Sequence, residues 1–268
     1  MAIQNRNHPI GVFDSGLGGL TVVKALQRYL PHEHIVYFGD TARVPYGTKS
    51  SAAIIRFSKE NVRILMRHDV KMVVVACNSS SSYALNALKR EFKLPITGVI
   101  DAGVRRAVST TRNKVIGIVA TPATIASGAY QRKIKALNSS LKVICQACPL
   151  FVPLAEEGWF RHKATQLIAT DYLATIRRSR ADTVVLGCTH YPLLKPIFKR
   201  ILGRHVTLID SAEEVALEVR DFLDRIDNDR LSSTKGRIAF LVSDMPSHFS
   251  RTAARFLGYK IRNVKKVK

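Results

Sequence analysis

The chain of 268 residues is 46% hydrophobic and 23% charged, as expected for a globular protein with one large domain or two ordinary ones. This composition excludes a disordered chain, a collagen and a small disulfide-stapled protein. Forty-two Lys and Arg against twenty Asp and Glu give a net charge of +22, which should attract anions and nucleic acids non-specifically.

The sequence contains no apolar run that approaches the roughly 18 residues of a membrane span. The longest runs, Met72–Cys77 and Val115–Ala120, are far shorter. The N-terminal segment MAIQNRNHP has no apolar signal core behind Arg6. We therefore expect a cytoplasmic protein that does not insert into membranes.

Apolar strand, turn and amphipathic helix alternate along the chain. A strand over Ile10–Phe13 is followed by the turn DSGLGG and a helix over Thr21–Tyr29. A second strand over His34–Phe38 precedes a long basic helix over Ser50–His68. Further strands, with helices between them, are expected at Met72–Ala76, Pro95–Ile100, Val115–Ala120, Val143–Gln146, Val184–Leu186, Val206–Ile209 and Ile238–Val242. This alternation indicates an α/β fold with mainly parallel sheets.

Ligands of such folds bind beyond the carboxyl ends of the strands, so the residues that end each strand are candidates for a site. Nearly all of these strand-end residues are polar or reactive. They are Asp14, Ser15, Gly39, Asp40, Cys77, Asn78, Asp101, Thr121, Cys188, Thr189, His190, Asp210 and Ser211. The segment Met245–Lys268 holds seven basic and no acidic residues, and we expect it to be a solvated end.

The four cysteines fall into two pairs with different expectations. Cys145 and Cys148 have the C-x-x-C spacing of redox and zinc sites, but no second pair accompanies them, so we expect two packed residues. Cys77 and Cys188 each follow a strand and precede a helix start, an environment that favours the thiolate. Two such thiols suit a reaction in which one removes a proton from a carbon and the other returns one from the opposite face.

Three titratable side chains near these strand ends, Asp14, His190 and Glu156, have different expected roles. Asp14 either caps a helix, or places a carboxylate in the cleft, or does both; the glycines at 16, 18 and 19 do not match the G-x-G-x-x-G spacing of a nucleotide-binding turn. His190 lies beside Cys188 and is a candidate proton partner. Glu156, in the segment PLFVPLAEEGW, is by default a surface carboxylate.

Seven segments together resemble the glutamate racemases, cofactor-independent enzymes that supply D-glutamate for bacterial peptidoglycan. They are IGVFDSGLGGLTV, YFGDTARVPYG, VVVACNSSSSYAL, ATPATIASGAY, CPLFVPLAEEG, VLGCTHYPLL and LIDSA, and they span almost the whole chain. The element GCTH favours glutamate racemases over the related aspartate racemases. Ser79 replaces the usual Thr, GVIDAG lacks the usual Pro before Gly, and the basic surface is not a family requirement.

The resemblance implies roles for individual residues. Cys77 and Cys188 are expected to be the catalytic acid/base pair, acting on the D- and the L-isomer respectively, with Asp14 and His190 assisting them and Asp40 and Glu156 as further acidic assistants. The residues expected to bind substrate are Asp14, Ser15, Tyr46, Gly47, Asn78, Ser79, Thr121, Thr189 and His190. L- and D-glutamate are the expected ligands, no metal or cofactor is expected, and a homodimer is an expected assembly.

The resemblance also implies two similar α/β domains with mainly parallel central sheets and the active site in the cleft between them. Residues 1–98 with 211–268 form the expected first domain, which carries Asp14 and Cys77, and residues 99–210 form the second, which carries Cys188 and His190. An aspartate or other amino-acid racemase is one alternative. A basic nucleic-acid-binding protein is another, supported by charge alone because no recognised binding motif is visible.

Overall fold

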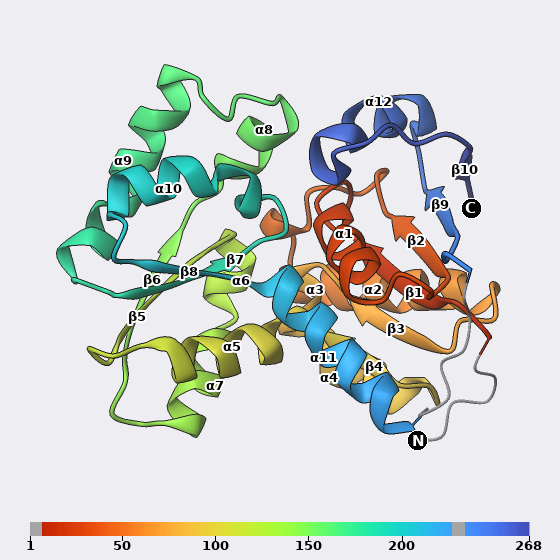
Figure 1. Cartoon of the computed structure of the whole chain (residues 1–268), viewed down its shortest axis with the longest axis horizontal. Helices are drawn as coiled ribbons and strands as arrows, with labels where there is room; N and C mark the ends of the chain where they lie inside the picture. The colour runs from red at the N-terminus through yellow and green to blue at the C-terminus, as the bar shows by residue number, and fades with distance from the viewer. Residues whose placement is uncertain (1–6, 227–233, 268) are drawn as a thin grey trace.

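Two parallel sheets organise the protein, as the computed structural model of residues 7–226 and 234–267 shows (Figure 1). One sheet has six strands in the order β10-β9-β2-β1-β3-β4, and the other has four in the order β6-β5-β7-β8. Every pairing between strands of the described residues is parallel, which confirms the expected α/β class. The strands are β1 (Ile10–Asp14), β2 (Ile35–Gly39), β3 (Met72–Val75), β4 (Ile96–Gly98), β5 (Val115–Ala120), β6 (Lys142–Ala147), β7 (Thr183–Gly187), β8 (Thr207–Asp210), β9 (Ile238–Val242) and β10 (Val264–Lys266).

Helices connect these strands, as parallel pairing requires. They are α1 (Leu20–Tyr29), α2 (Ser51–Met66), α3 (Asn78–Tyr83), α4 (Leu85–Glu91), α5 (Val99–Thr110), α6 (Pro122–Ala126), α7 (Ala129–Leu137), α8 (Phe151–Glu156), α9 (Lys163–Arg178), α10 (Lys195–Leu202), α11 (Ser211–Ile226) and α12 (Pro246–Leu257), with the 3₁₀ turns η1 (Tyr46–Thr48) and η2 (Tyr191–Leu194). No helix of the described residues is long and apolar enough to cross a membrane. Residues 1–6, on which the expectation about a signal segment mainly rests, lie outside the described residues, as does Lys268.

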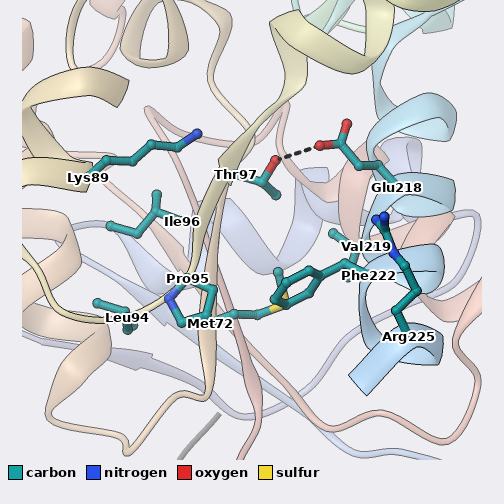
Figure 2. A pocket seen from close by; sticks show the side chains of 10 residues that line it. All are labelled: Met72, Lys89, Leu94, Pro95, Ile96, Thr97, Glu218, Val219, Phe222 and Arg225. Carbon is teal, nitrogen blue, oxygen red and sulfur yellow. Dashed lines mark hydrogen bonds between the residues drawn. The ribbon is translucent and has the colours of Figure 1, made fainter. Parts of the chain in front are cut away.

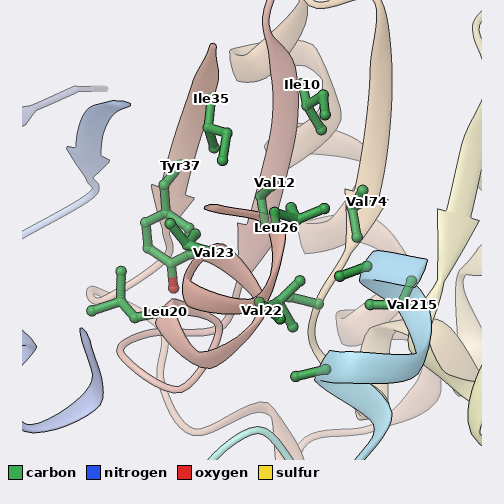
Figure 3. Close-up of a cluster of buried hydrophobic side chains, with 14 of the residues drawn as sticks. Ile10, Val12, Leu20, Val22, Val23, Leu26, Ile35, Tyr37, Val74 and Val215 are labelled. Atoms are coloured by element: carbon green, nitrogen blue, oxygen red, sulfur yellow. The ribbon is translucent and has the colours of Figure 1, made fainter. Parts of the chain in front are cut away.

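Both faces of each sheet are covered by apolar side chains, which explains why the strands are continuous apolar runs rather than alternating ones. In the larger sheet, α1, α11 and α12 pack on one face through a core that includes Val12, Leu26 and Val215 (Figure 3). Helices α2 and α4 cover its other face. In the smaller sheet, α8, α9 and α10 cover one face and α5 and α7 the other.

Two separate segments of the chain contribute strands to the larger sheet. Strands β1 to β4 belong to it, β5 to β8 build the smaller sheet, and β9 and β10 return to the larger one (Figure 1). The expected return of the strand Ile238–Val242 to the first sheet is confirmed. As a result, the loops that follow β1 and β3 on one sheet and those that follow β5 and β7 on the other can contribute residues to one site.

Two expectations about elements are wrong. Val99 and Ile100 do not continue a strand but begin α5, where both are fully buried, so tertiary packing overrides the strand preference of their branched side chains. Met245–Lys268 is not a solvated end, because it forms α12 and β10. Helix α12 buries Phe249, Ala253, Phe256 and Leu257, a spacing of four, three and one that gives one apolar stripe, while its basic residues occupy the other faces.

The core in Figure 3 predicts the cost of removing its side chains. Leu26 has no exposed surface, so Leu26→Ala should lower the free energy of unfolding by about 2–5 kcal/mol through lost burial and a residual cavity. Leu167→Ala, at a side chain that is 72% exposed, should change it by less than about 0.5 kcal/mol. Urea unfolding monitored by circular dichroism compares the two; equal midpoints for both variants would contradict the assignment of Leu26 to the core.

Candidate functional site

Two buried thiols occupy equivalent positions on the two sheets. Cys77 follows β3 and is the N-cap residue of α3, and Cys188 follows β7 just before the turn η2. Their relative exposures are 6% and 7%. Both therefore lie at the carboxyl end of a central parallel strand, where folds of this class bind ligands.

Cys188 has an imidazole and a carboxylate aligned behind it. Its Sγ lies 3.8 Å from Nδ1 of His190, and Nε2 of the same ring lies 2.9 Å from Oε1 of Glu156, at the end of α8. Burial of His190 lowers its pKa, but hydrogen bonds and charge from Cys188 and Glu156 more than offset this and raise the pKa to about 10. The ring is thus held protonated near neutral pH, where it can donate a proton to the sulfur.

Cys77 lies beside a carboxylate rather than an imidazole. Burial raises the pKa of the Cys77 thiol to about 12, and the negative charge of Asp14 acts in the same direction. The backbone N–H and hydroxyl of Ser80 act in the opposite direction, as expected for donors near a helix N-terminus. In the absence of substrate, Cys77 is therefore a protonated thiol near neutral pH.

Asp14 is fully buried between the two thiol environments. Burial raises the pKa of its carboxyl, whereas the charge of His190 and the N–H groups of Gly19, Gly16 and Ser15 lower it. The carboxylate accepts hydrogen bonds from the Gly16 N–H (3.1 Å) and from the Thr189 hydroxyl (3.5 Å). The helix-cap reading of Asp14 is wrong, since Gly19 precedes α1 and no side chain caps that helix. The cleft-carboxylate reading is the one that the contacts support.

Loops from the two sheets meet around these groups. The Thr21 hydroxyl donates to the Thr189 carbonyl (3.2 Å), and the hydroxyls of Ser79 and Thr121 lie 3.1 Å apart. A Cβ on Gly18 would fall 2.2 Å from Oγ1 of Thr189, which no side chain could tolerate. Gly47 is equally constrained, since its Cβ would lie 2.7 Å from that of Thr121. Glycine at these two places permits the close approach of the loops.

Asp40 and Tyr46 form a separate network beside this contact. The Tyr46 hydroxyl donates to Asp40, Asn61 donates to the same hydroxyl at 3.1 Å, and Nε of Arg43 lies 2.6 Å from the Asp40 carboxylate. Ser243 occupies the second oxygen of Asp40 at 2.9 Å. No hydrogen bond of the described residues joins Asp40 to either thiol; the contacts of its carboxylate are to Arg43, Tyr46 and Ser243.

Some residues at the site were not found from the sequence. The Tyr130 hydroxyl donates to Oδ1 of Asn78 (2.8 Å) and lies 3.3 Å from the Ser211 hydroxyl, so it orients the amide next to Cys77. Ser80 has a fully buried hydroxyl without a nitrogen or oxygen partner. The serine run after Cys77 could have indicated Ser80, whereas nothing local distinguishes Tyr130, which reaches the site from α7.

The C-x-x-C pair has the expected structural role. Cys145 and Cys148 are free, and Cys148 packs in the core between the smaller sheet and α8, with Cys145 against the opposite face. Among the described residues, no group of three or more His, Cys, Asp and Glu side chains could hold a metal ion.

A cavity of about 390 Å³ lies away from the thiols, at the outer edge of the larger sheet. Figure 2 shows it between α4 and α11, across strand β4, where Thr97 donates a hydrogen bond to Glu218. Its walls include Ile96, Val219 and Phe222, and none of the predicted site residues lines it. The site is thus defined by the contact between the two sheets and not by this cavity.

Comparisons with known proteins agree with this geometry. A model of the Asp/Glu/Hydantoin racemase family matches residues 10–219. The glutamate racemase of Geobacter metallireducens is 48% identical over 258 residues, which cover 96% of each chain. Among solved structures, glutamate racemase RacE1 of Bacillus anthracis is 37% identical with a TM-score of 0.93, and that of Francisella tularensis in complex with D-glutamate is 38% identical with a TM-score of 0.90; both alignments cover 98% of each chain. Picrophilus torridus aspartate racemase, 18% identical over 80% of this chain and 94% of its own with a TM-score of 0.57, shares the fold alone.

The Glu156–His190 contact predicts how the imidazole titrates. Because the carboxylate is one of the groups that raise the pKa of His190, Glu156→Gln should shift the ring titration to lower pH. The adjacent, exposed Glu157 provides a matched control, and Glu157→Gln should leave the titration in place. NMR of the ring carbons, assigned through His190→Gln, measures both; an unchanged titration in Glu156→Gln would contradict the contact.

Proposed function

The chain belongs to the Asp/Glu/Hydantoin racemase family and falls among its glutamate racemases, and on that premise we propose how its residues act. It interconverts L- and D-glutamate, and the D-isomer serves peptidoglycan synthesis. The observation that carries the mechanism is the pair of buried thiols, one at the end of β3 and one at the end of β7, each with its own charged partner.

The two thiols perform the proton transfer. With the L-isomer bound, the thiolate of Cys188 removes the α-proton, so the Cα–H bond breaks and an S–H bond forms while the electron pair stays on the substrate. The thiol of Cys77 then protonates the opposite face of that carbon, which yields the D-isomer and a Cys77 thiolate. The reverse direction exchanges the roles. His190 serves Cys188 through its 3.8 Å contact, with Glu156 holding the ring.

In this proposal, hydrogen-bond donors and one carboxylate recognise the substrate. Asp14 suits the ammonium group of glutamate, because a buried carboxylate gains most from a cationic partner. The proposed ligands of the two substrate carboxylates are hydroxyls, amides and backbone N–H groups, from Ser15, Tyr46, Gly47, Asn78, Ser79, Thr121, Thr189 and His190. Ser79 keeps a hydroxyl that contacts Thr121 and Thr124, which supports a shared binding role for this cluster.

The catalytic cleft implies a division of the chain. We propose a first domain of residues 1–98 and 211–268 and a second of residues 99–210; membership of β1–β4 and β9–β10 in one sheet and β5–β8 in the other supports these boundaries. A homodimer and a cytoplasmic location stay predictions. The net charge of +22 supports a weaker, salt-sensitive attraction of anions and nucleic acids outside the site.

Racemisation can be followed directly by polarimetry or circular dichroism. The dialysed protein without added cofactor should convert either enantiomer of glutamate to the racemate and leave aspartate unchanged by comparison. An absolute need for added pyridoxal phosphate, or a preference for aspartate, would overturn the proposal.

Single substitutions test the division of labour between the thiols. Cys77→Ser and Cys188→Ser each replace a titratable thiol with a far weaker acid of similar size, so racemisation should fall by about 10²–10⁴-fold or more in both. Cys145→Ser, at a free thiol on the far side of the smaller sheet's core, is the control and should retain activity. Near-normal racemisation by Cys188→Ser would show that one thiol does all the work.

A further inference from the structure

The C-terminal helix α12 belongs to the core of the larger sheet but contacts the catalytic machinery of the smaller one. The ring of Phe256 lies 5.4 Å from that of His190, edge to face at 90°. Both residues are 2% exposed, so the two rings form a buried contact. The same imidazole contacts the sulfur of Cys188. Figure 1 shows α12 and α8 facing each other across the gap between the two sheets.

A second contact joins Arg255, the residue before Phe256 in α12, to Glu156, which holds the His190 ring. Nη1 of Arg255 donates a hydrogen bond to the backbone carbonyl of Glu156, at the last residue of α8. The chain turns there through Gly158, whose φ is +78°, and a Cβ at that position would lie 3.1 Å from Cζ of Arg255. Glycine thus satisfies the backbone of the turn and admits the guanidinium against it.

Helix α8 has little of its own to fix Glu156. It has six residues, of which only Phe151 and Ala155 are buried, and the segment that follows is largely exposed. The Glu156 side chain is itself 28% exposed, while the His190 ring that it holds is buried. An external support for the end of α8 is therefore needed to keep the carboxylate at 2.9 Å from the ring.

We propose that Arg255 and Phe256 are positioning residues that hold the Glu156–His190 pair against Cys188. Helix α12, which packs on the larger sheet, thereby supports the proton relay formed by Glu156, His190 and Cys188 on the smaller sheet. The relay is complete only when these parts of the two sheets are in contact. This inference rests on the proposed two-thiol racemisation and adds to it the residues that set the geometry of one half.

The groups around His190 fix the sign of the expected effect. Cys188 lies on its own loop, Glu156 reaches it from α8, Asp14 acts on it from the end of β1, and α12 presents the uncharged Phe256. Loosening the end of α8 withdraws Glu156, whose hydrogen bond and charge raise the pKa of the ring. The alkaline limb of the pH–rate profile should then move to lower pH.

The test compares two pairs of variants in the full chain. Arg255→Ala and Phe256→Leu should lower kcat by about tenfold or more, as expected when a positioned group is displaced, with a much smaller change in KM. Both should shift the His190 ring titration to lower pH, and Arg255→Lys should restore part of the loss. The controls lie on the same helix: Arg251→Ala, at an exposed residue one turn earlier, and Leu257→Ala, at a buried residue of the sheet core.

The outcomes separate this inference from the proposed function. If the wild type racemises glutamate while Arg255→Ala and Phe256→Leu match their controls in kcat and in the His190 titration, the positioning role is refuted. If the wild type fails to racemise glutamate, the proposed function fails, and the NMR titration alone still decides whether α12 holds the pair. If Phe256→Leu does not fold, the exposed Arg255 carries the test by itself.

Discussion

A fully buried carboxylate between two ionisable environments is the constraint on which the site depends. Asp14 raises the pKa of the Cys77 thiol on one side, and on the other side the charge of His190 stabilises the carboxylate. Burial raises the pKa of this carboxyl, and the charge of His190 and the N–H groups of Gly19, Gly16 and Ser15 act in the opposite direction. The tight glycine-rich turn after β1 is what points these donors at one carboxyl group.

Bringing the second thiol to that carboxylate requires two sheets to present their strand ends to each other. The contact is made through small and hydroxyl side chains, because the Gly18 and Gly47 positions have no room for a Cβ and Thr21, Ser79, Thr121 and Thr189 supply the hydrogen bonds. Hydrogen bonds made by hydroxyl groups therefore join the described residues of the two sheets here, rather than buried ion pairs.

The sequence predicted most of the sheets and the two thiols because those features are local: branched apolar runs end in Cys, Asp or Thr, and parallel strands share one functional edge. The predictions from sequence were wrong where long-range packing determines the secondary structure. The seven basic residues of the C-terminal segment led to the prediction of a solvated end, although the segment also contains the apolar stripe of α12. Val99 and Ile100 were expected in a strand, but they lie in α5, where they are buried. Tyr130, Arg255 and Phe256 reach the site from distant elements, so no spacing could have identified them.

Solvent isotope incorporation tests the two-thiol account most directly. In deuterium oxide, racemisation of L-glutamate should place deuterium at Cα of the D-glutamate formed in the first few per cent of reaction. The remaining L-glutamate should stay almost unlabelled, because Cys188 returns the proton that it removed while Cys77 delivers one from solvent. Deuterium that appears in recovered L-glutamate as fast as in the product would contradict two separate bases and require a single base that serves both faces.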